Sequence, residues 1–122
     1  VISQRTALGA LTAGPAYCRG FLADIDAVRQ LCLERLTQLG DQVQVPAAEG
    51  AFYLLVRLQT DLDAMHVVTR LVQEHKVAVI PGDAFGLNDA CYLRIAYGAL
   101  RQEDVAVGMD RLVGGLAQIL AA

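Results

Sequence analysis

The chain has little charge, few cysteines and no long uninterrupted apolar run, and each of these shortages excludes a class of protein. Only 19% of its 122 residues are charged, the net charge is -3 and no basic stripe occurs, so we expect neither a nucleic-acid partner nor an anionic membrane surface. No apolar run approaches the roughly 20 residues of a membrane helix, and no leader resembles a signal peptide. The 55% hydrophobic content excludes a disordered chain. A soluble, cytoplasmic protein is expected.

The cysteines and histidines do not form a recognisable metal-binding or disulfide pattern. Cys18, Cys32 and Cys91 are far apart and lack a CxxC spacing, which predicts neither a disulfide framework nor a zinc site. Cys32 lies on the apolar stripe of a predicted helix and Cys91 begins a predicted strand, so core packing is expected for both. His66 and His75 are nine residues apart without a third ligand, which predicts surface histidines and no metal site.

The stretch VAVIPGDAFGLNDACYLRIAYG carries the strongest local signals. Its two apolar runs, Val77–Ile80 and Cys91–Tyr97, are rich in β-branched and aromatic residues and predict strands. Pro81 cannot continue a strand ladder, and Gly82 and Gly86 allow backbone angles that other residues avoid. The sequence therefore predicts a loop of defined shape between two strands.

Arg94 is the charged residue in the otherwise apolar second strand, and it is the candidate binding residue. Alternation places its side chain on the opposite face from Leu93, Ile95 and Tyr97. A guanidinium among apolar residues suits bidentate capture of a carboxylate or a phosphate. The alternative is an edge-strand arginine that lies in solvent or pairs with Asp83 or Asp89. Spacing alone leaves both interpretations open.

Apolar residues at helical spacing predict the helices. A first helix begins near Val1 and is broken or kinked at Gly14-Pro15, and a long helix follows and ends at Gly40. A third lies near residues 62–76, and a last one follows residues 101–104. The buried stripes are expected to be Phe21, Ile25, Val28, Cys32, Leu36 and Leu39 in the long helix, Leu62, Met65, Val68, Leu71 and Val72 in the third, and Val105, Met109, Leu112, Leu116 and Ile119 in the last.

Two further strands complete the expected fold. Gln42–Val45 alternates polar and apolar residues before a proline and predicts an edge strand. Ala51–Leu58 is apolar almost throughout and predicts a central strand covered on both faces, with Phe52 and Tyr53 in the core rather than stacked on a cofactor. Together the elements predict a two-layer α/β domain with a mixed sheet of three or four strands and helices mainly on one face.

Four motifs in order make the chain resemble a known family. EGAFYLLVRL, PGDAFG, YLRIAYG and the late pair Arg111-Leu112 are similar to the C-terminal part of the class I and II aminotransferases, the aspartate aminotransferase-like group of the type I fold, which depend on pyridoxal phosphate. The resemblance implies that residues 17–122 are the small domain and that residues 1–16 are a remnant of the large-domain or interdomain helix. It also implies that Arg94 grips the substrate's α-carboxylate.

The resemblance further implies what lies outside this chain. Such an enzyme moves an amino group between an amino acid and a 2-oxo acid, is commonly a homodimer, and needs a Schiff-base lysine, an acidic partner for the cofactor and a phosphate cup. None of these motifs occurs here, and Lys76, the one lysine, has the context of an ordinary surface residue. We therefore expect no catalytic, cofactor-binding or metal-binding residue in this chain. We expect pyridoxal phosphate in a full-length parent with a large domain, and an isolated chain that is inactive.

Two alternatives remain at the level of sequence. Related enzymes of the same fold catalyse β-elimination or decarboxylation, and fold likeness does not fix the reaction. The chain could also be a self-contained module that uses Arg94 and the loop 81–88 to hold a small carboxylate.

Overall fold

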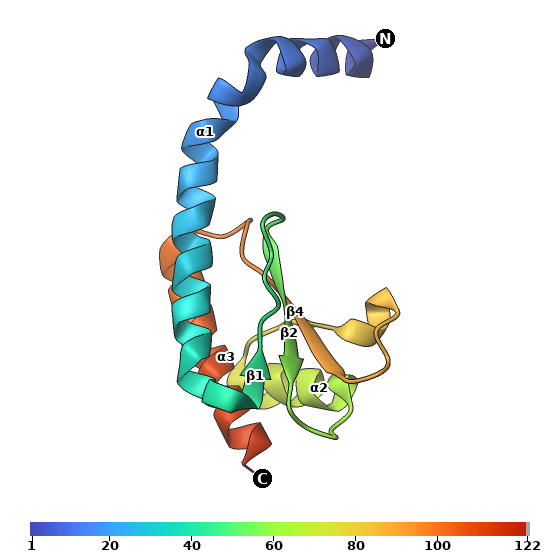
Figure 1. Cartoon of the computed structure of the whole chain (residues 1–122), viewed down its shortest axis with the longest axis vertical. Helices are drawn as coiled ribbons and strands as arrows, with labels where there is room; N and C mark the ends of the chain where they lie inside the picture. Colours follow the sequence, from blue (N-terminus) through green and yellow to red (C-terminus); the bar gives the residue numbers. More distant parts are fainter. Residues whose placement is uncertain (122) are drawn as a thin grey trace.

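A computed structural model describes residues 1–121 and arranges them as a helical layer against a four-stranded sheet (Figure 1). This confirms the predicted two-layer α/β class. The elements are α1 (Ile2–Leu36), the 3-10 turn η1 (Thr37–Gln42), β1 (Val43–Gln44), β2 (Tyr53–Leu58), α2 (Ala64–His75), β3 (Ile80–Pro81), the 3-10 turn η2 (Gly82–Phe85), β4 (Cys91–Ala96) and α3 (Gln102–Leu120).

The sheet has the strand order β1-β2-β4-β3, and every neighbouring pair is antiparallel. The prediction of a mixed sheet is therefore wrong. The predicted crossover exists, because α2 connects β2 to β3 and these two strands run in the same direction. They are not neighbours, however, since β4 lies between them and pairs antiparallel with both.

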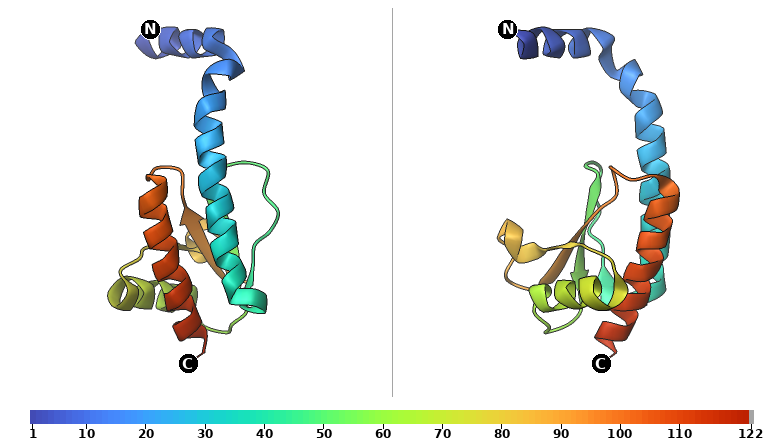
Figure 2. Two further views of the ribbon diagram at one scale, coloured as in Figure 1. Left: turned by 90° about the vertical axis from the view of Figure 1, so that its left-hand side faces the viewer. Right: turned by 180° about the vertical axis from the view of Figure 1, so that it is seen from behind.

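One face of the sheet is covered by helices, as predicted. α1 and α3 lie side by side (Figures 1 and 2). An ion pair between Arg35 Nε and Asp110 Oδ1, 2.9 Å long, joins them. We call this the covered face of the sheet. Its strand residues are Leu54, Val56, Leu58, Cys91, Leu93 and Ile95, and all are buried in one core with residues of the three helices.

The opposite face, which we call the open face, corrects the prediction that the central strand is covered on both sides. It carries Tyr53, Leu55, Arg57, Tyr92, Arg94 and Ala96, none of which is fully buried. Tyr53 is 36% exposed and Phe52 is 54% exposed, so the expectation that both lie in the core is wrong. The strand predicted at Val77–Ile80 is reduced to the edge strand β3.

The buried stripes of the helices agree with the sequence in part. All five residues predicted for α3 are buried, and the lower part of the α1 stripe is buried from Val28 onward. The stripe predicted for α2 is right only in part. Leu71 is buried and Val68 is partly buried against the core, whereas Leu62, Met65 and Val72 are exposed and the remaining core contacts come from Ala64 and Val67. α3 packs closely against α2 at Gly115, because a Cβ at this position would lie only 2.8 Å from His75 Cγ.

α1 is two helical segments joined by the predicted kink. Gly14 has non-helical angles (φ 70°, ψ -174°) directly before Pro15. The first segment turns away from the rest of the fold (Figure 2). Leu8 and Leu11 on this segment are exposed, and so is Phe21 beyond the kink, which corrects its predicted place in the buried stripe. No helix within residues 1–121 is both long and apolar enough to cross a membrane.

Candidate functional site

Arg94 lies at the centre of the open face. On β4 it faces Leu55 of β2 on one side and Ile80 of β3 on the other. Its strand neighbours Leu93 and Ile95 point into the core, so the predicted alternation is confirmed. The sheet therefore presents a partly buried guanidinium on a side that no helix covers.

Two aromatic rings lie against the guanidinium. Its central carbon is 4.1 Å from the centroid of the Tyr53 ring and 5.0 Å from that of Phe85. Both distances are within the range of cation–π attraction. Arg94 Nε is buried and has no hydrogen-bond partner, and within residues 1–121 Arg94 makes no ion pair. The alternative pairing with Asp83 or Asp89 is thus not present in the structure.

The turn η2 holds Phe85 beside Arg94. Gly86 N–H donates to the Asp83 carbonyl at 2.9 Å, and Leu87 N–H donates to the Gly82 carbonyl at 3.1 Å. Gly86 adopts φ 81°, which favours glycine. A Cβ on Gly82 would lie 2.5 Å from Tyr92 Cβ, so only glycine lets the turn approach β4 this closely. The predicted loop of defined shape is confirmed. Its two glycines are needed for different reasons, Gly82 for the close approach to β4 and Gly86 for its positive φ.

The start of β2 is fastened by contacts that the sequence did not indicate. The Tyr97 hydroxyl donates to the Ala51 carbonyl at 3.3 Å, and Tyr97 N–H donates to the Phe52 carbonyl at 3.0 Å. Arg29 of α1 donates to the Ala48 carbonyl at 2.7 Å. These long-range bonds hold the loop that leads into Tyr53, and only an alignment or a structure could have revealed them.

The other titratable candidates have structural roles. Burial raises the pKa of the Cys32 and Cys91 thiols to about 11, which disfavours the reactive thiolate. His66 is exposed and His75 partly exposed, as predicted. Among residues 1–121 no three His, Cys, Asp or Glu side chains are placed to hold a metal ion.

Lys76 is a capping residue, which agrees with its interpretation as an ordinary surface lysine. It ends α2 in a left-handed conformation (φ 57°) and its Nζ donates to the Gln73 carbonyl at 2.6 Å. Its exposed ammonium is thus engaged by the end of its own helix.

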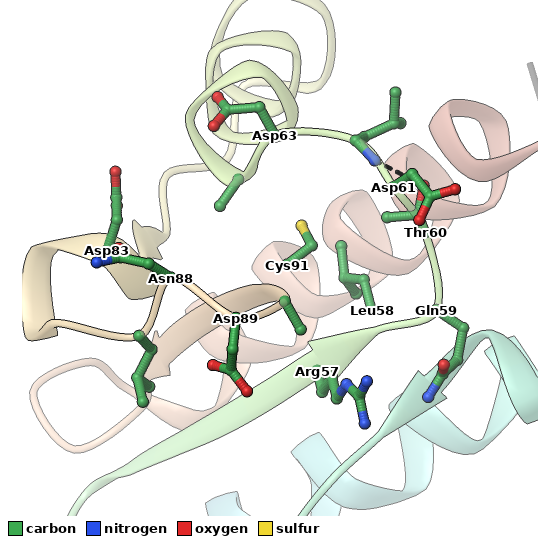
Figure 3. A pocket seen from close by; sticks show the side chains of 14 residues that line it. Arg57, Leu58, Gln59, Thr60, Asp61, Asp63, Asp83, Asn88, Asp89 and Cys91 are labelled. Atoms are coloured by element: carbon green, nitrogen blue, oxygen red, sulfur yellow. Dashed lines mark hydrogen bonds between the residues drawn. The ribbon is translucent and has the colours of Figure 1, made fainter.

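A hollow of about 780 Å³ lies at the far end of β2 and the start of β4 (Figure 3). Arg57 lines it together with four carboxylates, those of Asp61, Asp63, Asp83 and Asp89. Figure 3 shows these carboxylates spread around the hollow rather than converging on one point. Arg94 is not among its lining residues. Size alone therefore does not identify the site, and the partly buried guanidinium of Arg94, with its buried and unpaired Nε, is the stronger candidate.

Comparison of the sequence with protein families gives one consistent result. Residues 2–112 match the family described as aminotransferase class I and II. The aromatic aminotransferase ISS1 of Arabidopsis thaliana is 34% identical over 121 residues, covering 98% of this chain and 30% of the relative. The aspartate aminotransferase of Pyrococcus abyssi is 37% identical over 90 residues, covering 73% and 22%. The chain thus spans less than a third of the length of these curated relatives.

Solved structures of similar fold agree with the sequence comparison. An aromatic aminotransferase from Pyrococcus horikoshii superposes with a TM-score of 0.70 at 30% identity, covering 82% of this chain and 26% of that one. The α-aminoadipate aminotransferase LysN from Thermus thermophilus, complexed with N-(5'-phosphopyridoxyl)-L-leucine, gives a TM-score of 0.72 at 26% identity, covering 81% and 26%. In each case the likeness extends over about a quarter of the larger chain.

Proposed function

This chain belongs to the class I and II aminotransferase family, and from that premise we propose that it is the part of such an enzyme that anchors the substrate's carboxylate through Arg94. The parent enzyme would move an amino group between an amino acid and a 2-oxo acid. Residues 17–122 would form its small domain, and residues 1–16 would belong to the helix that leads from the large domain.

One observation carries the role of Arg94. Its guanidinium is partly buried on the open face, with a buried Nε and no carboxylate partner among residues 1–121. A charged group in this state is stabilised when an external anion completes its hydrogen bonds. Both partners of the reaction carry a carboxylate beside the reacting carbon. Anchoring that carboxylate would fix the position of the bond that reacts.

The described residues do not fit a complete site for pyridoxal phosphate. The one lysine, Lys76, caps α2 and donates to the Gln73 carbonyl, and it is not presented on the open face beside Arg94. We therefore propose that the Schiff-base lysine and the phosphate cup belong to the rest of a longer enzyme. A homodimer of that enzyme remains part of the proposal.

Pyruvate, the simplest 2-oxo acid, tests the role of Arg94 in the 122-residue chain. We expect saturable binding with a dissociation constant of the order of millimolar, the strength of a few polar contacts at a partly open site. Arg94→Gln should lower the affinity at least about tenfold, because a charge-assisted hydrogen-bonded pair is replaced by a neutral contact. NMR titration of ¹⁵N-labelled chain measures both affinities and locates the perturbed residues.

Arg57→Gln is the matched control, since Arg57 is an exposed arginine on the same open face. It should leave pyruvate binding unchanged, and pyruvamide, which lacks the carboxylate, should not bind the unmodified chain. Equal loss of affinity in Arg57→Gln and Arg94→Gln would contradict the proposal, because binding would then reflect general positive charge. Specific borohydride-trapped labelling of Lys76 by pyridoxal phosphate would contradict the assignment of the cofactor site to the rest of the enzyme.

A further inference from the structure

We propose that Tyr53 and Phe85 are positioning residues for Arg94, and that they restrict carboxylate binding to the terminal Nη1 and Nη2 edge of its guanidinium. This inference rests on the proposed carboxylate-binding role of Arg94 and adds the means by which the side chain is held. Its starting point is the contact of the guanidinium carbon with two rings, at 4.1 Å and 5.0 Å.

The burial of Nε determines which edge of the guanidinium is available. A guanidinium can meet a carboxylate either through Nε and one terminal nitrogen or through both terminal nitrogens. In this structure Nε is buried and has no partner, while the terminal nitrogens are not among the buried unpaired atoms of residues 1–121. An incoming carboxylate therefore meets Nη1 and Nη2, and its plane is set by that of the guanidinium.

Each ring is held by a part of the fold that does not depend on Arg94. Tyr53 begins β2, and the preceding residues are tied to Tyr97 by hydrogen bonds from its hydroxyl and its N–H. Phe85 ends η2, whose approach to β4 requires the absence of a side chain at Gly82. β4 lies between β2 and β3 in the sheet. One ring thus comes from β2, on one side of β4, and the other from the turn that follows β3, on the other side.

This arrangement reduces the cost of ordering the arginine when an anion binds. A free arginine side chain has many rotamers, and it loses this freedom when it is ordered. Here the rings attract the guanidinium and confine it before any ligand arrives. Loss of either ring should therefore weaken carboxylate binding although neither ring contacts the carboxylate.

The test compares variants that remove a ring with one that keeps it. Tyr53→Leu and Phe85→Leu remove one ring each and leave an apolar side chain, whereas Tyr53→Phe removes only the hydroxyl. We expect each leucine variant to bind pyruvate about three- to tenfold more weakly than the unmodified chain, and Tyr53→Phe to bind within about twofold. Pyruvamide controls for contacts that do not involve the carboxylate.

A second measurement does not depend on any ligand. In the ¹⁵N-labelled 122-residue chain, the Arg94 Nε–H proton should be shifted upfield by the rings and should exchange slowly with water because it is buried. The exposed Arg57 provides the reference signal. Both features should weaken in the leucine variants and persist in Tyr53→Phe.

The outcomes separate this inference from the proposed function. If pyruvate fails to bind the unmodified chain but the Nε–H signature behaves as expected, the carboxylate-binding role fails in this chain and the rings still position Arg94. If pyruvate binding depends on Arg94 but neither leucine variant changes the affinity or the Nε–H signal, the positioning role is overturned. An equal effect of Tyr53→Phe and Tyr53→Leu would also overturn it, because the hydroxyl and not the ring would then be responsible.

Discussion

The two faces of the sheet differ in what their residues do, although the same two strands supply both. On the covered face, β2 and β4 contribute only apolar side chains that are buried against the helices. On the open face, the alternate residues include two arginines and two tyrosines, and none is fully buried. Strand alternation thus separates stability from chemistry within single-residue steps. A substitution on the covered face should therefore change mainly the stability of the chain, and one on the open face should change mainly the candidate site.

Adjacent leucines of β2 test this comparison most strongly. Leu54 is 1% exposed on the covered face, whereas Leu55 is half-buried on the open face opposite Arg94. Leu54→Ala should lower the free energy of unfolding by about 2–5 kcal/mol, because it leaves a cavity in the core. Leu55→Ala should cost less than about 1.5 kcal/mol, since water can reach the site. Urea unfolding measures both, and equal losses would remove the distinction between the two faces.

Glycine substitutions extend the comparison to the turn over the open face. An alanine at Gly82 would collide with Tyr92 Cβ and lie 3.2 Å from the Tyr92 carbonyl oxygen, so η2 and Phe85 must move. Gly82→Ala should cost about 1–3 kcal/mol, as overpacking does, and should weaken the Arg94 Nε–H signature.

Gly108→Ala is the matched control for that substitution. Gly108 lies within α3 with nothing near its missing Cβ, so alanine should stabilise the chain by about 0.5–1 kcal/mol and leave the Arg94 signal unchanged. A Gly82→Ala variant with an unchanged Nε–H signal would show that Phe85 does not depend on the position of the turn.

The sequence was informative where side chains alternate or repeat with one clear phase. The run Cys91–Tyr97 has polar or exposed residues at every second position, and its strand and the direction of Arg94 were predictable from that pattern. The last helix has one apolar stripe, and it is buried as expected. The order of the four motifs was sufficient to indicate the family.

The errors came from segments whose apolar residues do not distinguish between faces. β2 carries Tyr53 and Leu55 on its open face, where both lie beside Arg94. Because these residues are largely apolar, like those on the covered face, the pattern predicted a strand covered on both sides. α2 offers two overlapping apolar stripes, and the contacts with the core, not the spacing, choose between them. The ring contacts of Arg94 join β2, η2 and β4, and no local pattern encodes contacts between separate segments.

Alkaline pH should lower the stability of the folded chain, because two thiols are buried in its core. Burial raises the pKa of Cys32 and of Cys91 from 9.0 to about 11, with a smaller contribution from Asp63 to Cys91. Between these values the folded chain keeps protons that the unfolded chain releases, so stability is full below pH 9 and is lost as the pH rises toward 11. We expect the Tm to fall by about 10 °C between pH 8 and pH 10, because the two thiols together lose about 2–3 kcal/mol of stability.

Cysteine variants show whether that alkaline loss belongs to the core. Cys32→Ala removes one buried thiol and should reduce the fall in Tm, even though its Tm at pH 8 is lower because a core side chain is truncated. Cys18→Ala changes an exposed thiol and should reproduce the unmodified pH profile. Differential scanning fluorimetry at a series of pH values measures all three. A fall of equal size in Cys32→Ala and in the unmodified chain would mean that the Cys32 thiol does not contribute to the pH dependence of folding, since the loss would then come from groups that the substitution leaves in place, such as Cys91.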